Sequence, residues 1–169
     1  MTAFIAPRMA RIAVYVYGGN SMTQENKQLL LQDLSARLPY GVMVLEDIDK
    51  EFDGGCVSKL VTITEIKGEK MFFTKSSFTP VTIEEIRPYL RSMSSMTEEE
   101  KEELSHLLPK NWSIEIDKLN NLYFDMCTTV FLEIDSILNI LNWLLSRHFD
   151  FQGLIEKELA LEALEGMYK

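Results

Sequence analysis

The chain has 169 residues, of which 46% are apolar and 25% are charged, as in ordinary globular proteins with one domain or two small subdomains. Its formal net charge of −9 argues against a broad phosphate-binding surface, which needs clustered Lys and Arg. No apolar run reaches the roughly 20 residues that span a bilayer, so we expect no membrane segment and a cytoplasmic protein. Cys56 and Cys127 form no C-x-x-C motif; reduced thiols are expected, with a disulfide or a metal ligand as alternatives.

Residues 1–21 differ from the rest of the chain because they contain Arg8 and Arg11 but no acidic residue. A short apolar run at 12–17, ended by glycines, allows three interpretations. It is a weak signal peptide, a strand added to a sheet, or part of a segment upstream of the natural start. We favour the third interpretation, because Met22 is followed directly by a helix pattern.

The first helix is predicted from Thr23 to Leu38, with Thr23 as the N-cap and leucines at every fourth position. Pro39 and Gly41 end it. Runs rich in β-branched and aromatic residues then predict a series of strands, followed by one helical turn at 84–86. The strands are predicted at 42–45, 57–66, 71–73 and 80–83. Strands this short predict a small, bent antiparallel β-unit, for which an SH3-like barrel is the analogy.

Residues 82–103 are predicted to join the two halves of the chain. Pro88 cannot lie inside a regular helix, because it has no N–H and clashes with the preceding turn. Thr97 and Glu100 have the S/T-x-x-E spacing of a capping box, which predicts the start of an acidic helix over 96–108. Three large side chains of the segment are expected to pack inward: Tyr89, Leu90 and Met93. The segment is therefore interpreted as a structural organiser.

The second half is predicted to combine helices with a second β-hairpin. Alternation at 112–117 indicates a strand, and 122–132, which also fits a helix, is assigned as its partner strand. The clearest helix spans 135–148 and has a wide apolar face, formed by Ile137, Leu138, Ile140, Leu141, Leu144 and Leu145. The last residues, 166–169, are expected to fray.

The predicted fold class is α+β. It consists of an N-terminal helix, a small bent antiparallel β-unit, and helices with a second β-hairpin. The predicted units are an extension over 1–21, the first helix with the β-unit over 22–91, and a second half over 92–169 that packs on it.

Three strings are characteristic in combination. LPYGV at 38–42 follows the leucine helix, RPYLR at 87–91 precedes SSMTEE at 94–99, and HFDFQGLI at 148–155 leads into LALEA and EGMY. Together they resemble a family of small uncharacterised proteins of gut bacteria and their phages and mobile elements, over residues 22–169. Many members have His-His where this chain has Arg147-His148. The resemblance implies a natural start near Met22 and a mobile-element setting, and it implies no catalytic residues.

An acidic loop is the sharpest candidate for a metal site. Asp49, Glu51 and Asp53 stand at alternate positions and Gly54 follows, as in the first half of an EF-hand loop. The twelfth position of such a loop, which requires a bidentate Glu, is occupied by Leu60. A solvated turn is therefore the favoured interpretation, and we expect neither a metal nor another cofactor.

His148 and Asp150 could form the acid–base pair of a hydrolase, because histidine titrates near neutrality. No nucleophile is placed beside them, and G-x-S-x-G, H-E-x-x-H and P-loop motifs are missing from the sequence. A histidine at a helix C-terminus and an acid in a loop are the more ordinary uses of such residues.

Two surfaces could bind macromolecules. Glu99, Glu102 and Glu103 form either a solvated helix face or a docking face for a basic protein partner. Lys70 and Phe72 could form a stacking platform for single-stranded nucleic acid, although a hydrophobic sheet face is the commoner use of such aromatics. We rank a non-enzymatic protein-interaction or accessory protein first, a nucleic-acid-binding β-unit second and a hydrolase third. A protein partner is thus expected, and the sequence leaves the oligomeric state open.

Overall fold

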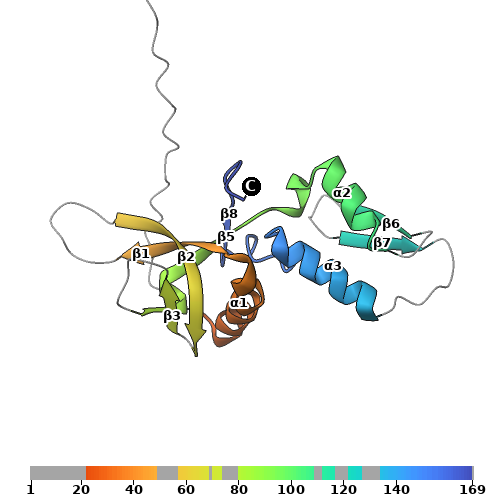
Figure 1. Ribbon diagram of the computed structural model, residues 1–169. Coiled ribbons are helices and arrows are strands. Elements are labelled where there is room, and N and C mark those ends of the chain that lie inside the picture. Colours follow the sequence, from red (N-terminus) through yellow and green to blue (C-terminus); the bar gives the residue numbers. More distant parts are fainter. Residues whose placement is uncertain are drawn as a thin grey trace, which may run out of the picture.

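The computed structural model describes residues 22–48, 57–68, 70–73, 80–108, 112–116, 122–126 and 134–168, and its fold is mixed α+β as predicted (Figure 1). In chain order the helices and strands are α1 (Gln24–Arg37), β1 (Met43–Ile48), β2 (Val57–Lys67), β3 (Lys70–Phe73), β4 (Val81–Thr82), β5 (Ile86–Leu90), α2 (Glu98–Ser105), β6 (Trp112–Ile116), β7 (Leu122–Met126), α3 (Ile134–Ser146) and β8 (Leu161–Glu162). The predictions for residues 1–21, Cys56 and Cys127 lie outside the described residues.

The first helix forms where its capping residue and leucines predict it. The Thr23 side chain accepts a hydrogen bond from the Asn26 N–H at 3.3 Å, which satisfies one of the unpaired donors of the first turn. Leu30 and Leu34 are fully buried against the sheet. The helix is followed by a 3₁₀ turn and by Gly41 at φ +72°, a left-handed conformation that glycine adopts without steric cost.

The β-unit is a meander of antiparallel strands. β1, β2, β3 and β4 pair in sequence, and β5 returns through a 3₁₀ turn to pair with the free edge of β1. The strand order in the described residues is β4-β3-β2-β1-β5-β8. This connectivity agrees with the SH3-like analogy, which stays a prediction because strand order alone does not show that the sheet closes into a barrel. The parallel addition of β8 to β5 was not predicted.

β5 contains the predicted organiser of the fold. Its burial alternates along the strand, as it must when successive side chains point to opposite faces. Leu90 is therefore fully buried, and Met93, just after the strand, is buried too. Tyr89 faces the other side of the strand and is only half-buried, so the expectation that it packs inward like Leu90 is wrong.

The second half consists of α2, the β6–β7 hairpin and α3, which Figure 1 shows grouped on the side of the molecule away from β3. The predicted capping box is present: the Thr97 hydroxyl accepts from the Glu100 N–H, and the Glu100 carboxylate accepts from the Thr97 N–H. α2 is shorter than predicted at both ends, because Met96 is extended ahead of the cap and the chain turns after Ser105. The predicted hairpin is confirmed for β6 and β7; residues 127–133 lie outside the described residues.

Two hydrophobic clusters correspond to the two halves, except at the C-terminus. The first cluster lies between α1 and the β-unit and includes Leu30, Val44 and Leu90. The second lies between α2 and α3 and includes Met93, Leu144 and Phe149. Leu154, Leu159 and Ala160 belong to the first cluster. The chain after α3 therefore crosses back to the β-unit, so a division at residue 91 does not separate the two cores cleanly.

The C-terminal tail is anchored at Tyr168. Its hydroxyl donates to the Tyr89 carbonyl at 2.6 Å and accepts from the Met43 N–H at 3.0 Å. Its ring stacks on His148 with 3.8 Å between ring centroids. Burial of the phenol raises the pKa of Tyr168 to about 12. The expectation that residues 166–169 fray is thus wrong for Tyr168, whose partners are far away in the sequence.

We expect Tyr168→Phe to lower the free energy of unfolding by about 1–2 kcal/mol, because the Met43 N–H and the Tyr89 carbonyl both lose a partner. Tyr40→Phe, at an exposed tyrosine, is the matched control and should change it by less than about 0.5 kcal/mol. Urea denaturation measures both. Equal stabilities of the two variants would mean that the tail is not held by its hydroxyl.

Candidate functional site

Arg91 joins the two halves through its backbone. Its N–H donates to the His148 carbonyl at 2.8 Å, and its carbonyl accepts from the Asp150 N–H at 2.8 Å. This exchange forms a parallel bridge between Arg91 and Phe149. The end of β5 is thereby fixed against the segment that follows α3.

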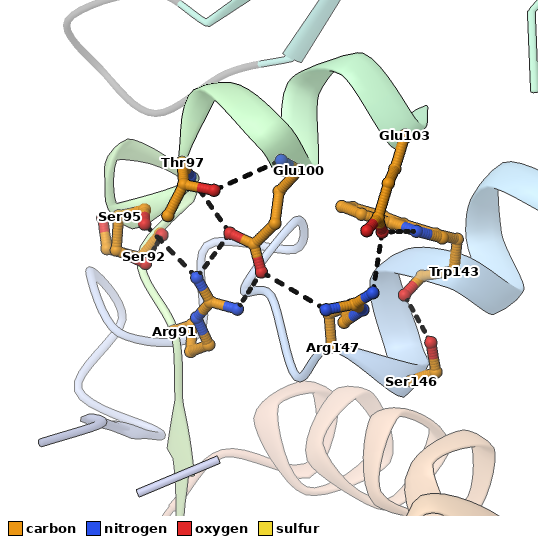
Figure 2. Close-up of polar contacts among 9 residues, drawn as sticks. All are labelled: Arg91, Ser92, Ser95, Thr97, Glu100, Glu103, Trp143, Ser146 and Arg147. Atoms are coloured by element: carbon orange, nitrogen blue, oxygen red, sulfur yellow. Dashed lines mark hydrogen bonds and ion pairs between the residues drawn. The ribbon is translucent and has the colours of Figure 1, made fainter. Parts of the chain in front are cut away.

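The guanidinium of Arg91 holds the acidic helix in place. It donates to both carboxylate oxygens of Glu100, at 2.6 and 2.8 Å, and to the Ser95 carbonyl at 3.3 Å (Figure 2). Its Cζ atom lies 4.2 Å from the centre of the Phe149 ring, within the range of a cation–π contact. The hydrogen bonds from Arg91 hold the pKa of Glu100 below its ordinary value. Glu100 therefore serves both as a helix cap and as the partner of Arg91.

A second ionic contact ties α2 to the end of α3. Arg147 Nη2 donates to Glu103 Oε2 at 2.7 Å, and Trp143 Nε1 donates to the same oxygen at 3.4 Å (Figure 2). Arg147 also lies 3.8 Å from Glu100. Of the three glutamates predicted to bind a partner, Glu103 is thus used inside the molecule. Glu99 and Glu102 are exposed. Hydrogen bonds from the Glu99 backbone N–H and from the Thr97 side chain lower the pKa of Glu99.

A fully buried ion pair links α1 to the segment that follows α3. Arg37 donates to both oxygens of Asp33, at 2.7 and 2.9 Å, and neither side chain is exposed. Arg37 Nη2 also donates to the Phe149 carbonyl at 2.8 Å, and Gln152 Nε2 donates to Asp33 at 3.0 Å. Sequence reasoning missed this pair. The available signal was an Asp and an Arg spaced i, i+4 within a run of leucines on one helix.

The two candidate catalytic residues have structural partners. Both Asp150 oxygens accept backbone hydrogen bonds, from Leu154 at 2.9 Å and from Ile155 at 2.8 Å. His148 is only 4% exposed, has φ +59° and stacks on Tyr168. Burial, together with the positive charge of Arg37, lowers the pKa of His148 to about 4. The histidine is therefore neutral at pH 7 and shielded from solvent, which leaves little access for a substrate.

A small cavity of about 300 Å³ lies beside the tail. It is bordered by Asp150, Lys157 and Glu162 among others, but not by His148. Its serine, Ser92, shares a hydrogen bond of 2.7 Å with the Ser94 hydroxyl. Lys157 Nζ is held by the Gln152 carbonyl at 2.8 Å. Both side chains are thus engaged in hydrogen bonds with neighbouring residues of the fold.

The outer side of α3 carries three exposed apolar side chains. Ile134 is 74% exposed, Ile137 is 40% exposed and Leu138 is 51% exposed. Their spacing of i, i+3 and i+4 places them on one face of the helix, and we call them the α3 stripe. Ile140 and Leu144, on another face, are buried in the second cluster. The wide apolar face predicted from the sequence is therefore only partly used by the core.

The side chains of the remaining predicted site residues lie outside what the structure describes. Asp49, Glu51 and Asp53 lie outside the described residues. Lys70 and Phe72 belong to β3, but only the backbone of that strand is described. Within the described part of the chain, no group of three or more His, Cys, Asp or Glu side chains could hold a metal ion. The metal and nucleic-acid hypotheses thus stay predictions.

Comparison with family models, with curated proteins and with solved structures found no match for this chain. The resemblance to proteins of gut bacteria and mobile elements therefore stays a prediction. None of the described helices is both long enough and apolar enough to cross a membrane.

We expect Glu100→Gln to lower the free energy of unfolding by roughly 1–3 kcal/mol, because glutamine still accepts from the Thr97 N–H but leaves the mostly buried Arg91 without an anionic partner. Glu98→Gln, in the exposed pair with Lys101, is the matched control on the same helix turn and should cost less than about 0.5 kcal/mol. Thermal or urea unfolding compares them. A similar loss in both variants would contradict the special role of Glu100.

The lowered pKa of His148 predicts that the protein loses stability in acid. Because its folded pKa of about 4 lies below the ordinary value near 6.5, the unfolded chain binds the proton first as the pH falls. The contribution of His148 to the free energy of unfolding is fully present above pH about 6.5. It declines by about 3 kcal/mol as the pH falls to about 4.

The variant His148→Asn should remove this component of the pH dependence, since asparagine tolerates positive φ. His106→Asn, at the second of the two histidines and exposed after α2, should retain it. Urea unfolding at pH 4.5 to 7 measures the difference between the two slopes. Parallel slopes for both variants would refute the assignment.

Proposed function

We propose that this protein is a non-enzymatic interaction protein that binds another protein through the α3 stripe. The single observation that carries the proposal is the exposure of Ile134, Ile137 and Leu138 on one helix face. Single exposed apolar residues are common on protein surfaces, but several large ones side by side are characteristic of interaction sites.

The use of the polar groups supports the same proposal. Asp150, Glu100 and the Asp33–Arg37 pair are all engaged in hydrogen bonds that hold the fold together. His148 is buried and neutral at pH 7. Since these ionisable groups stabilise the fold, a binding role requires fewer assumptions than catalysis by His148 and Asp150. In the mobile-element setting that the resemblance implies, an accessory or host-interference role would fit.

The test is an affinity capture that compares two variants of α3. Immobilised protein is incubated with a lysate of gut bacteria, and the captured proteins are identified by mass spectrometry. We expect Ile137→Ser combined with Leu138→Ser to reduce the amount of a specific captured protein at least about tenfold, because the change removes exposed apolar contacts that a partner would bury.

Asn139→Ser is the matched control, because Asn139 is exposed on the same helix outside the stripe. It should leave capture unchanged. Both variants should unfold at the same denaturant concentration as the natural sequence, since the substituted side chains are exposed. Capture that is the same with and without the stripe would refute the proposal.

A further inference from the structure

We infer that the partner presents a cationic amphipathic helix to the α3 stripe, an inference that rests on the proposed function. The shape of the stripe is the first argument. Together with the half-buried Leu141, the stripe forms an apolar row that extends for about 10 Å along α3. A ridge of side chains spaced i, i+3, i+4 and i+7 fits between the side-chain rows of a second helix.

The position of the stripe leaves it accessible. Figure 1 shows the C-terminal end of α3 near α1, while the end that begins at Ile134 points away from the β-unit. Exposure is accordingly greatest at Ile134, at 74%. A helix of another protein could therefore lie along this face without displacing the described elements of the core.

The size of the stripe argues against a second copy of the chain as its occupant. Stable interfaces bury about 800 Å² on each partner, and four aliphatic side chains, most of them partly covered already, supply much less. A further source of binding free energy is therefore needed. In a pair of identical chains that source cannot be charge, because both surfaces would carry the same sign.

The distribution of charge indicates where the further binding free energy comes from. Residues 92–169 contain 15 Asp and Glu but 6 Lys and Arg, so they carry a formal charge of −9, whereas residues 1–91 contain 11 of each and are neutral. Residues 92–153, before the chain crosses back to the β-unit, contain 11 Asp and Glu but 4 Lys and Arg, so most of the net charge lies in the part of the chain that contains α3. Such a surface attracts cationic partners and repels phosphate-rich ones.

Three exposed acids of α2, β6 and α3 make no ion pair with another described residue. Glu98, Glu100 and Glu103 are paired with basic residues. Glu102 on α2, Glu115 on β6 and Asp135 in the first turn of α3 are exposed, and no ion pair joins them to another described residue. Lysines or arginines beside the apolar face of a partner helix would neutralise such groups.

The first experiment measures binding of two synthetic peptides of about 18 residues, long enough to form a helix. Both place leucines at helical spacing and lack tryptophan. One has lysine at the remaining positions and the other has glutamate. Titration is followed by the fluorescence of Trp112 and Trp143, both of which contact the second cluster. We expect the lysine peptide to bind at least about tenfold more tightly, and its affinity to fall as salt is raised from about 50 to 300 mM.

Variants separate specific docking from general charge attraction. The Ile137→Ser, Leu138→Ser protein should bind the lysine peptide at least about tenfold more weakly, and so should Glu102→Lys combined with Asp135→Lys. Asn139→Ser should bind as the natural sequence does. Equal binding of both peptides, or no loss with the serine pair, would overturn the inference. So would a dimer in sedimentation that the serine pair abolishes.

Competition distinguishes failure of this inference from failure of the proposed function. Excess lysine peptide should release the protein captured from the lysate. If the captured protein depends on the stripe but is released neither by the peptide nor by salt, the proposed function stands and the cationic helix is wrong. If nothing depends on the stripe in either experiment, both are wrong.

Discussion

The arrangement of both halves depends on the exchange of hydrogen bonds at Arg91. Its backbone pairs with the chain on both sides of Phe149, and its guanidinium lies on the Phe149 ring while it binds Glu100. Arg91 thus connects the end of β5 to the start of α2 and to the end of α3. Because the guanidinium is planar and offers donors in a fixed geometry, it can satisfy a carboxylate and a ring at the same time. A lysine at this position could not reproduce both contacts.

Phe149 lies between two buried or partly buried arginines. Arg91 covers its ring, and Arg37, the last residue of α1, donates a hydrogen bond to its carbonyl. Burial, together with the positive charge of Arg37 and Arg91, explains the lowered pKa of His148, because a protonated imidazole there would be both desolvated and repelled. The Asp33–Arg37 pair adds less stability than its short distances suggest, since desolvation opposes the attraction in a buried pair. We expect its main effect to be to fix how α1 meets the segment after α3.

These contacts also bear on function. Among the described residues, Arg37, Arg91 and Asp150 are engaged in hydrogen bonds that hold the segment 147–155 in place, and the exposed surface has features suited to binding. There the apolar stripe and the excess of acids occur in the same half of the chain. An apolar ridge supplies binding free energy, and an excess of acids in the same part of the chain selects the charge of the partner and accelerates encounter. The two features together support one binding surface better than either does alone.

Features that depend on residues close together in the chain could be predicted from the sequence. The Thr23 cap, the capping box of Thr97 and Glu100, the exclusion of Pro88 from a helix and the β6–β7 hairpin all depend on residues a few positions apart. The exposure of Glu102 also followed from its helix. The tertiary structure alone decided the burial of Asp33 and Arg37, the pairing of β8 with β5, the anchoring of Tyr168 and the part of the α3 face left open. Each of these depends on segments distant in sequence, and hydrophobic periodicity shows that a face is apolar without showing what, if anything, covers it.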